Sequence, residues 1–328
     1  MEDKRKAKNA EELRSLIGRV MIRNKRGPQI KLPSRKVATM PLMPSEGEIA
    51  LYRRITDFVR NEYQKGEQAT VNPLTLLTLQ REVCSSSFAA AITLFKLCQK
   101  TKEDEAAKIL TLMELAKKLE ENTKMNLVEE ILHQIGEEKT IISTEFRATL
   151  EYIHSRLKRK GIPALTFDGS MSASKKDYTL GRFRRDPNYQ VLICTESGGE
   201  GINLQFCRTM INYDLPWNPM RLEQRIGRIH RLGQARETYI YNLVTMGTIE
   251  EHLIRLLEEK VCLFELVIGD LQKIINYFGY ERSFEAKIME ALLQAENDSE
   301  LSKNFATLGD QILERVKKEP ELGIDALL

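Results

Sequence analysis

Residues 190–203 read QVLICTESGGEGIN, a short apolar run followed directly by a glycine-rich segment. The run Gln190–Cys194 has the length and composition of a buried strand. Four similar β-branched runs surround it, at Thr140–Ser143, Ala164–Phe167, Arg208–Tyr213 and Thr238–Val244. Helical patterns separate the five runs, over Glu145–Lys160, Ser174–Arg185, Met220–His230 and Thr248–Glu259. This alternation predicts an α/β fold, in which helices cover both faces of a parallel sheet.

The remainder of the chain is mainly helical. Apolar spacing predicts a helix over 11–23, a short strand over Lys36–Met43 and a helix over Glu46–Tyr63, followed by long helical stretches over Pro73–Lys100 and Glu103–Ile135. The pattern of apolar residues changes near Gly136, where strand-like and helical segments begin to alternate. We therefore divide the chain into an N-terminal segment (1–45), a helical segment (46–135), the α/β region (136–268) and an acidic helical tail (269–328).

Composition excludes several classes of protein. The chain has 328 residues, 42% of them hydrophobic and 30% charged, with 50 Lys+Arg against 47 Asp+Glu for a net charge of +3. These are globular values, which exclude a wholly disordered or collagen-like chain. No apolar run approaches the ~20 residues that a membrane span needs, and the charged start is not a secretory signal. We expect a cytoplasmic protein.

The cysteines indicate no special site, whereas the charge is distributed unevenly along the chain. Five Cys without CxxC pairs and four dispersed His predict neither a disulfide framework nor a metal site. Residues 1–36 hold twelve Lys/Arg against four Asp/Glu, whereas the chain from Ser283 onward holds five against ten. A basic start suits a polyanionic partner, although such charge is more often only solvated.

The glycine-rich run after the strand is the first candidate site. Three Gly within 198–201 let the backbone approach a ligand closely, and Thr195, Ser197 and Asn203 add hydroxyl and amide groups. That chemistry suits phosphate oxygens, and the alternative is a plain tight turn. The run is neither a P-loop nor a complete dinucleotide-binding fingerprint.

The second candidate site is an arginine-rich segment, residues 221–234. A helix there would place four guanidiniums on one face, and Leu222, Ile226 and Ile229 on another; the four are Arg221, Arg225, Arg228 and Arg231. Only Glu223 offers local compensation, so the like charges predict an anion ligand. A solvated surface is the alternative. Gly227 favours the ligand, because it costs helix propensity and makes room for a close approach.

Five segments, in this order, resemble motifs of the C-terminal RecA-like lobe of Swi/Snf-like superfamily-two helicases and DNA translocases, of the bacterial or archaeal type. Lys139–Arg147 resembles motif IV, Thr195–Leu204 motif V and Gln224–Gln234 motif VI. Phe167–Ser170 and Asn212–Pro219 resemble two shorter motifs of the same lobe. Glu196 departs from the eukaryotic pattern, which often has a basic or small residue there.

The resemblance assigns roles to individual residues. It implies that two arginine fingers act in catalysis, namely Arg228 and Arg231. It implies nucleotide contacts by Glu200, Gly201, Gln224 and Arg225. It implies contacts to DNA by Ser143, Arg147, Gly169, Ser170, Thr195, Ser197, Gly198 and Trp217. For Trp217 the alternative is a loop anchor packed in the core.

The resemblance also implies the second motor lobe of an ATP-dependent, sequence-nonspecific double-stranded-DNA translocase. The sequence has neither Gly-x-x-x-x-Gly-Lys-Ser/Thr nor an Asp-Glu-x-His box, so we expect ATP and Mg²⁺ to be bound mainly by a first RecA-like lobe of the same protein. Residues 1–45 resemble the tail of that lobe. We expect ATP hydrolysis by the full-length, nucleoid-associated protein and none by this chain alone.

Two other functions stay open. A non-catalytic nucleic-acid-binding module would need only the strand contacts, so the complete motif VI argues against it. The other is a protein-interaction role, in which the 46–135 helices dock on RNA polymerase or another nucleic-acid-bound protein. The apolar residues of these helices have the spacing of ordinary core-facing helices, which gives this role no positive support.

Overall fold

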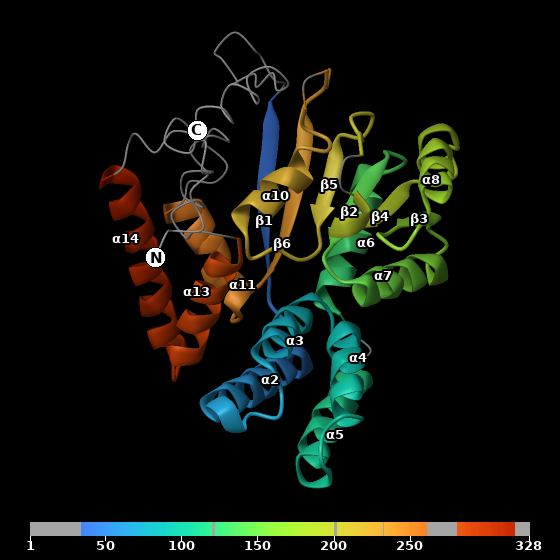
Figure 1. The fold of residues 1–328 in the computed structure, drawn as a ribbon. Helices are drawn as coiled ribbons and strands as arrows, with labels where there is room; N and C mark the ends of the chain where they lie inside the picture. The colour runs from blue at the N-terminus through green and yellow to red at the C-terminus, as the bar shows by residue number, and fades with distance from the viewer. Residues whose placement is uncertain (1–33, 120–121, 200–201, 232, 261–280, 319–328) are drawn as a thin grey trace, which may run out of the picture.

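The computed structural model describes residues 34–119, 122–199, 202–231, 233–260 and 281–318. Its centre is a six-stranded sheet in which every paired neighbour is parallel, ordered β1-β6-β5-β2-β4-β3 (Figure 1). The strands are β1 (Arg35–Leu42), β2 (Thr140–Thr144), β3 (Ala164–Phe167), β4 (Val191–Thr195), β5 (Thr209–Asn212) and β6 (Thr238–Thr245). The predicted α/β fold and its five strands are confirmed, and the predicted strand near Lys36 is the sixth, paired with β6 at the sheet edge.

Helices cover both faces of the sheet, as the unbroken apolar strands predict. On one face Ile141 and Leu192 pack with residues of α8 (Ala173–Arg185), α10 (Pro219–Ile226) and α11 (Ile249–Arg255). On the other face their chain neighbours Ile142 and Ile193 pack with residues of α6 (Thr123–Ile135) and α7 (Arg147–Arg159). Successive strand residues therefore enter two different cores, because side chains alternate across a sheet.

The helical segment before the sheet is more divided than its periodicity predicts. It contains α2 (Glu46–Gln64), the 3₁₀ turn η1 (Gly66–Gln68), α3 (Pro73–Ser85), α4 (Ser87–Cys98), α5 (Glu103–Lys118) and α6. The continuous helix predicted over Pro73–Lys100 is wrong at Ser86, which is extended and whose hydroxyl accepts the N–H of Ala89. The stretch Glu103–Ile135 is likewise interrupted before Asn122, which caps α6. Both residues bond the backbone locally and so begin a new helix.

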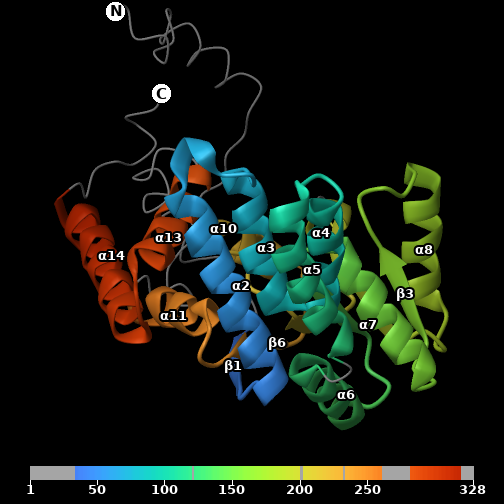
Figure 2. The ribbon, with the colours of Figure 1, turned by 90° about the horizontal axis from the view of Figure 1, so that it is seen from below.

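Within the described residues, two further helices follow the α/β region. α11 continues into the π-helical turn η2 (Leu256–Lys260), and α13 (Glu281–Gln294) and α14 (Asp298–Lys318) pack against each other (Figure 2). α14 also contacts α11 and η2, and Phe284 of α13 is fully buried. The predicted helix over 11–23 lies outside the described residues, and the division of the chain into four segments stays a prediction. Among the described helices, none is long and apolar enough to cross a membrane.

The buried carboxyl of Glu82, on α3, makes the stability of the helical segment depend on pH. Burial raises the pKa of its carboxyl to about 7, from a usual value of 4.5. Between these values the folded state keeps a proton that the unfolded state releases, so this group contributes stability below pH 4.5 that is lost as the pH rises to 7. We expect Glu82→Gln to gain roughly 1–3 kcal/mol of unfolding free energy relative to wild type on going from acid to pH 8.

Urea unfolding of both proteins at several pH values measures this difference. Glu130→Gln is the matched control, because Glu130 is exposed on α6. A difference between Glu82→Gln and wild type that is the same at acid and neutral pH would contradict the burial of an ionisable group at this position.

Candidate functional site

The predicted motifs converge at one edge of the sheet. Because β5, β2, β4 and β3 are neighbouring parallel strands, the segments that follow them emerge on the same side. These segments are Glu145–Arg147 after β2, Asp168–Ser170 after β3, the short helix α9 (Glu196–Gly199) after β4 and Asp214–Asn218 after β5. Segments separated by up to about 70 residues in sequence thus form one surface.

The segments after β3 and β4 pack closely at two glycines, Gly169 against the Ser197 side chain and Gly198 against the backbone of Asp168. A Cβ built on Gly169 would lie 2.6 Å from Oγ of Ser197, and one built on Gly198 would lie 2.6 Å from Cα of Asp168. A side chain at either position would force the two segments apart. The glycines therefore bring the residues predicted to contact DNA from these two segments into one cluster.

Polar groups complete this cluster. Ser170 donates its backbone N–H to Asp168 Oδ1 at 2.7 Å, and a bond from the Ser170 hydroxyl holds the pKa of Asp168 below its usual value. The exposed guanidinium of Arg147 donates to Ser170 Oγ at 3.4 Å and pairs with Glu151 at 3.1 Å. The result is an exposed cation beside serine hydroxyls and a tightly packed backbone, which is chemistry that suits a phosphate diester.

Three other residues predicted to contact DNA lie inside the protein. Ser143 and Thr195 are within buried strands, and Thr195 Oγ1 accepts the backbone N–H of Gly198 at 3.3 Å. The indole of Trp217 is 2% exposed, and the Arg81 guanidinium lies 5.9 Å from its ring centre. The structure places Trp217 in the core, the alternative that the sequence left open.

The candidate finger Arg228 lies against the glycine-rich segment. Its Nη2 donates to the Glu196 carbonyl at 3.4 Å, and a Cβ built on Gly199 would lie 1.5 Å from its Nη1. The guanidinium thus fills the space that a side chain at 199 would need. Arg228 is 8% exposed in this arrangement, although the segment that carries it is at the surface, since Gln224 and Arg231 are both exposed. Glu200 and Gly201 lie outside the described residues.

The predicted helix over Met220–His230 is wrong in its second half. α10 spans Pro219–Ile226, and Gly227 caps its C-terminus with an N–H bond to the Glu223 carbonyl at 2.8 Å. The four arginines therefore do not line one helix. The apolar half of the prediction is confirmed, because Leu222, Ile226 and Ile229 are fully buried.

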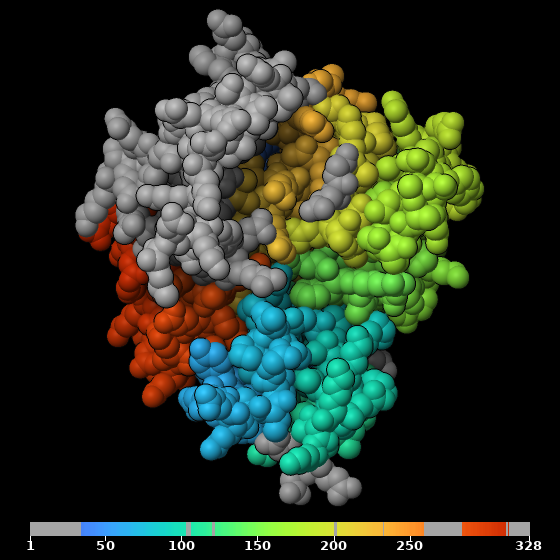
Figure 3. Space-filling view, in the orientation of Figure 1, coloured from blue at the N-terminus to red at the C-terminus, as the bar shows by residue number. Residues whose placement is uncertain are grey.

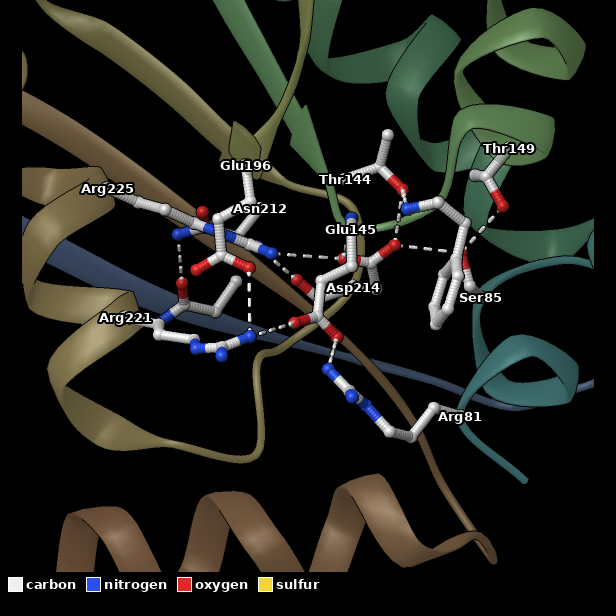
Figure 4. A network of polar contacts seen from close by, with 12 residues as sticks. Arg81, Ser85, Thr144, Glu145, Thr149, Glu196, Asn212, Asp214, Arg221 and Arg225 are labelled. Atoms are coloured by element: carbon white, nitrogen blue, oxygen red, sulfur yellow. Dashed lines mark hydrogen bonds and ion pairs between the residues drawn. The ribbon is translucent and has the colours of Figure 1, made fainter. Parts of the chain in front are cut away.

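Carboxylates from other strand ends neutralise two of these arginines (Figure 4). Arg225 is fully buried; its Nη1 donates to the Asp214 carbonyl at 2.7 Å and its Nη2 lies 3.4 Å from Asp214 Oδ1. Arg221 Nη1 lies 3.5 Å from Glu196 and 4.0 Å from Glu145. The expectation that Glu223 is the local counter-charge is corrected, because Glu223 bonds Arg35 at 3.0 Å.

The same network reaches the helical segment. Arg81 of α3 pairs with Glu145, and Ser85 of α3 donates its hydroxyl to Asp214 Oδ2 at 2.8 Å. Burial raises the pKa of Glu145 to about 7, against the opposing effect of Arg81 and then Arg225. Arg81, Glu145 and Asp214 are not among the site residues predicted from the sequence. The available signal was the excess of arginine in residues 221–231, beside acidic residues placed directly after buried strands.

Two amides fix the arginine-rich segment at its ends. Asn218 accepts the N–H of Met220 at 2.9 Å and caps α10. Gln234 Nε2 donates to the carbonyls of Gln205, Cys207 and Ile229 at 2.9–3.1 Å, which ties the end of the segment to the loop after the glycines. Within the described residues there is no group of three or more His, Cys, Asp or Glu that could hold a metal ion.

The chain is similar to known helicases and chromatin-remodeling factors. Residues 123–233 match the family described as the helicase conserved C-terminal domain. The chain is 43% identical over 296 residues to the uncharacterized ATP-dependent helicase YqhH of Bacillus subtilis, covering 89% of this chain and 52% of that protein. It is 28% identical over 265 residues to the CHD3-type chromatin-remodeling factor CHR7 of Arabidopsis thaliana, covering 76% of this chain and 21% of that protein.

Solved structures share the fold at low sequence identity. The C-terminal part of the Fun30 ATPase domain matches with a TM-score of 0.56 at 17% identity, over 81% of this chain and all of that one. The SWI2/SNF2 ATPase core of Sulfolobus solfataricus in complex with dsDNA matches with a TM-score of 0.53 at 20% identity, over 89% of this chain and 55% of that one. The chain thus spans about half the length of the bacterial relative and of the archaeal core.

Proposed function

Because this chain is the C-terminal RecA-like lobe of a Swi/Snf-like superfamily-two helicase, we propose that it is the second motor lobe of an ATP-dependent double-stranded-DNA translocase. One observation carries the proposal. The candidate finger Arg228 packs on Gly199, and the adjoining Ser197 and Gly198 pack on the Asp168–Ser170 segment. The candidate finger and the proposed strand-contacting surface are therefore joined through the four residues of α9.

On the nucleotide side, Arg228 and Arg231 act as arginine fingers toward ATP held with Mg²⁺ on a first lobe of the same protein. A permanently charged, planar guanidinium suits the charge that spreads over the phosphoryl oxygens during transfer. Gln224 is exposed near them, and Glu200 and Gly201 are the other proposed nucleotide contacts. Arg225, which was also predicted to contact the nucleotide, is fully buried, and we assign it to holding the segment in place through its bonds to Asp214. Without the first lobe, the fingers have no nucleotide to act on.

On the DNA side, Arg147, Ser170 and Ser197 contact the phosphate backbone of one strand, and Gly169 and Gly198 allow the approach. Ser143, Thr195 and Trp217 are the weaker members of this proposal because they are buried. Differential affinity for ATP and ADP would open and close the two lobes, so that movement of Arg228 moves the strand-contacting segment. Such a motor would act on the nucleoid, in the cytoplasm.

Salt dependence tests the DNA contacts. We expect the 328-residue chain to bind duplex DNA weakly and without sequence preference, with an affinity that falls about tenfold or more between roughly 50 and 200 mM salt. Arg147→Ala should weaken binding and reduce the slope of log affinity against log salt by about 1, as expected for one lost phosphate contact. Fluorescence anisotropy with a labelled duplex measures both.

Arg159→Ala is the matched control for this experiment. Arg159 is exposed at the opposite end of α7 from Arg147, so its substitution removes the same charge from the same helix. An affinity that does not change with salt, or equal effects of the two substitutions, would reject the assigned strand-contacting surface.

A further inference from the structure

Helix α8 is the outermost helix beside the edge strand β3, and it is strongly basic. It lies at the margin of the molecule in two perpendicular views, and its atoms form the rim of the space-filling surface (Figures 1, 2 and 3). Residues 172–185 hold five Lys/Arg and one Asp. Its inner face packs against the core, where Thr179 and Phe183 are buried. The function assigned so far uses none of its side chains.

Four exposed side chains form one stripe along the outer face of α8. Lys175, Tyr178, Arg182 and Arg185 follow one another at spacings of three or four residues, which places them on the same side of a helix. We call these four residues the α8 stripe. The ring of Tyr178 is 67% exposed between the cations. Asp177 lies roughly 120° from the centre of the stripe, so its carboxylate does not interrupt the positive charge.

Local contacts hold the two arginines of the stripe along the helix. Arg182 lies over the Tyr189 ring at 4.5 Å, and its Nε is 3.6 Å from Asp186. Arg185 Nε donates to the Gly181 carbonyl at 3.2 Å. These contacts restrain the guanidiniums and leave both side chains exposed to solvent. Restrained cations around an exposed tyrosine suit a regularly spaced polyanion better than a single small anion.

The stripe continues directly from the proposed strand-contacting surface. α8 begins three residues after Ser170, and Lys175 is close enough to Asp168 to lower the pKa of that carboxyl. From Lys175 to Arg185 the helix rises about 15 Å. Because phosphates of one DNA strand are spaced about 3.4 Å along the duplex axis, the stripe is long enough to accompany a strand past several of them.

We propose that the α8 stripe is a second site for the phosphate backbone of duplex DNA, which extends the contact made by Arg147, Ser170 and Ser197. Arg182 and Arg185 pair with successive phosphates, Lys175 bridges the two surfaces, and Tyr178 packs its ring against the sugar and donates its hydroxyl to phosphate. This inference rests on the proposed function, because it requires that the chain bind duplex DNA.

Equilibrium DNA binding by the 328-residue chain tests the stripe. Arg182→Ala/Arg185→Ala is expected to weaken binding about tenfold and to make the salt slope shallower by about 1.8, from 0.9 for each lost phosphate contact. Tyr178→Ala should weaken binding about threefold and leave the salt slope unchanged, because it removes a contact that carries no formal charge. Lys158→Ala/Arg159→Ala is the matched control, because it removes two exposed cations from the last turn of α7.

Arg147→Ala, measured in parallel, distinguishes a failure of the α8 site from a failure of the proposed function. If Arg147→Ala weakens binding and the stripe variants match the control, the α8 site is wrong and the proposed function stands. If neither Arg147→Ala nor the stripe variants change binding, the proposed strand-contacting surface fails as well. Thermal unfolding of each variant shows whether it is folded, and Tyr178→Phe isolates the hydroxyl without removing the ring.

Discussion

Replacing Arg228 by Ala in the longer ATPase that we propose, with a first lobe that holds ATP, is expected to abolish turnover and leave ATP binding nearly intact. The loss should be about 10³–10⁵-fold, the range that removal of an arginine finger produces in other phosphoryl-transfer enzymes. The guanidinium acts on charge that develops only in the transition state, so its removal lowers kcat far more than affinity. Arg228→Lys should remain strongly impaired, because an ammonium lacks the planar pair of donors.

Steady-state ATP hydrolysis and equilibrium nucleotide binding are the two measurements. Arg159→Ala, an exposed charge change far along α7, should leave both unchanged. Turnover of Arg228→Ala within threefold of wild type would remove the finger assignment. The 328-residue chain alone should hydrolyse no ATP, with or without duplex DNA, and clear DNA-stimulated turnover by it would mean that the chain itself holds a complete nucleotide site.

Asp214→Ala should be the most destabilising single substitution in the polar network, with a cost of about 3–5 kcal/mol of unfolding free energy. Asp214 and Arg225 are 2% and 0% exposed, so water cannot replace the lost carboxylate. The substitution leaves the buried Arg225 guanidinium without its carboxylate partner. It also removes the acceptor of the Ser85 hydroxyl and of the Glu145 N–H. Removing one partner of a buried charged pair is far more costly than removing an exposed one.

Urea denaturation measures this cost. Asp177→Ala is the control, because Asp177 is exposed on α8 and its loss should change stability by no more than about 0.5 kcal/mol. The double substitution Asp214→Ala/Arg225→Met should recover part of the loss, since it leaves no uncompensated charge. A cost below about 1 kcal/mol for Asp214→Ala would show that the pair is solvated and that the network does not hold the motif segments together.

Local patterns were sufficient for most of the fold. Ala164–Phe167 was predicted with the observed bounds, and the other strands of the α/β region within two residues, because apolar β-branched runs bounded by turns depend on their own residues. The errors fall where one polar side chain changes the backbone. Ser86 and Asn122 begin new helices by capping them, and Gly227 ends α10, although the apolar spacing continues past each of them.

By itself the sequence determined the α/β class, the parallel sheet and the resemblance to helicase motifs, because periodicity and short motifs are written in neighbouring residues. Only the tertiary structure decided what the arginines face. Glu145 and Glu196, which lie 76 and 25 residues before Arg221 in the chain, reach it from the ends of β2 and β4, and Asp214 pairs with the buried Arg225. Parallel strands bring their carboxyl ends to one edge regardless of sequence separation, so charge balance at that edge depends on strand order, which no local pattern contains.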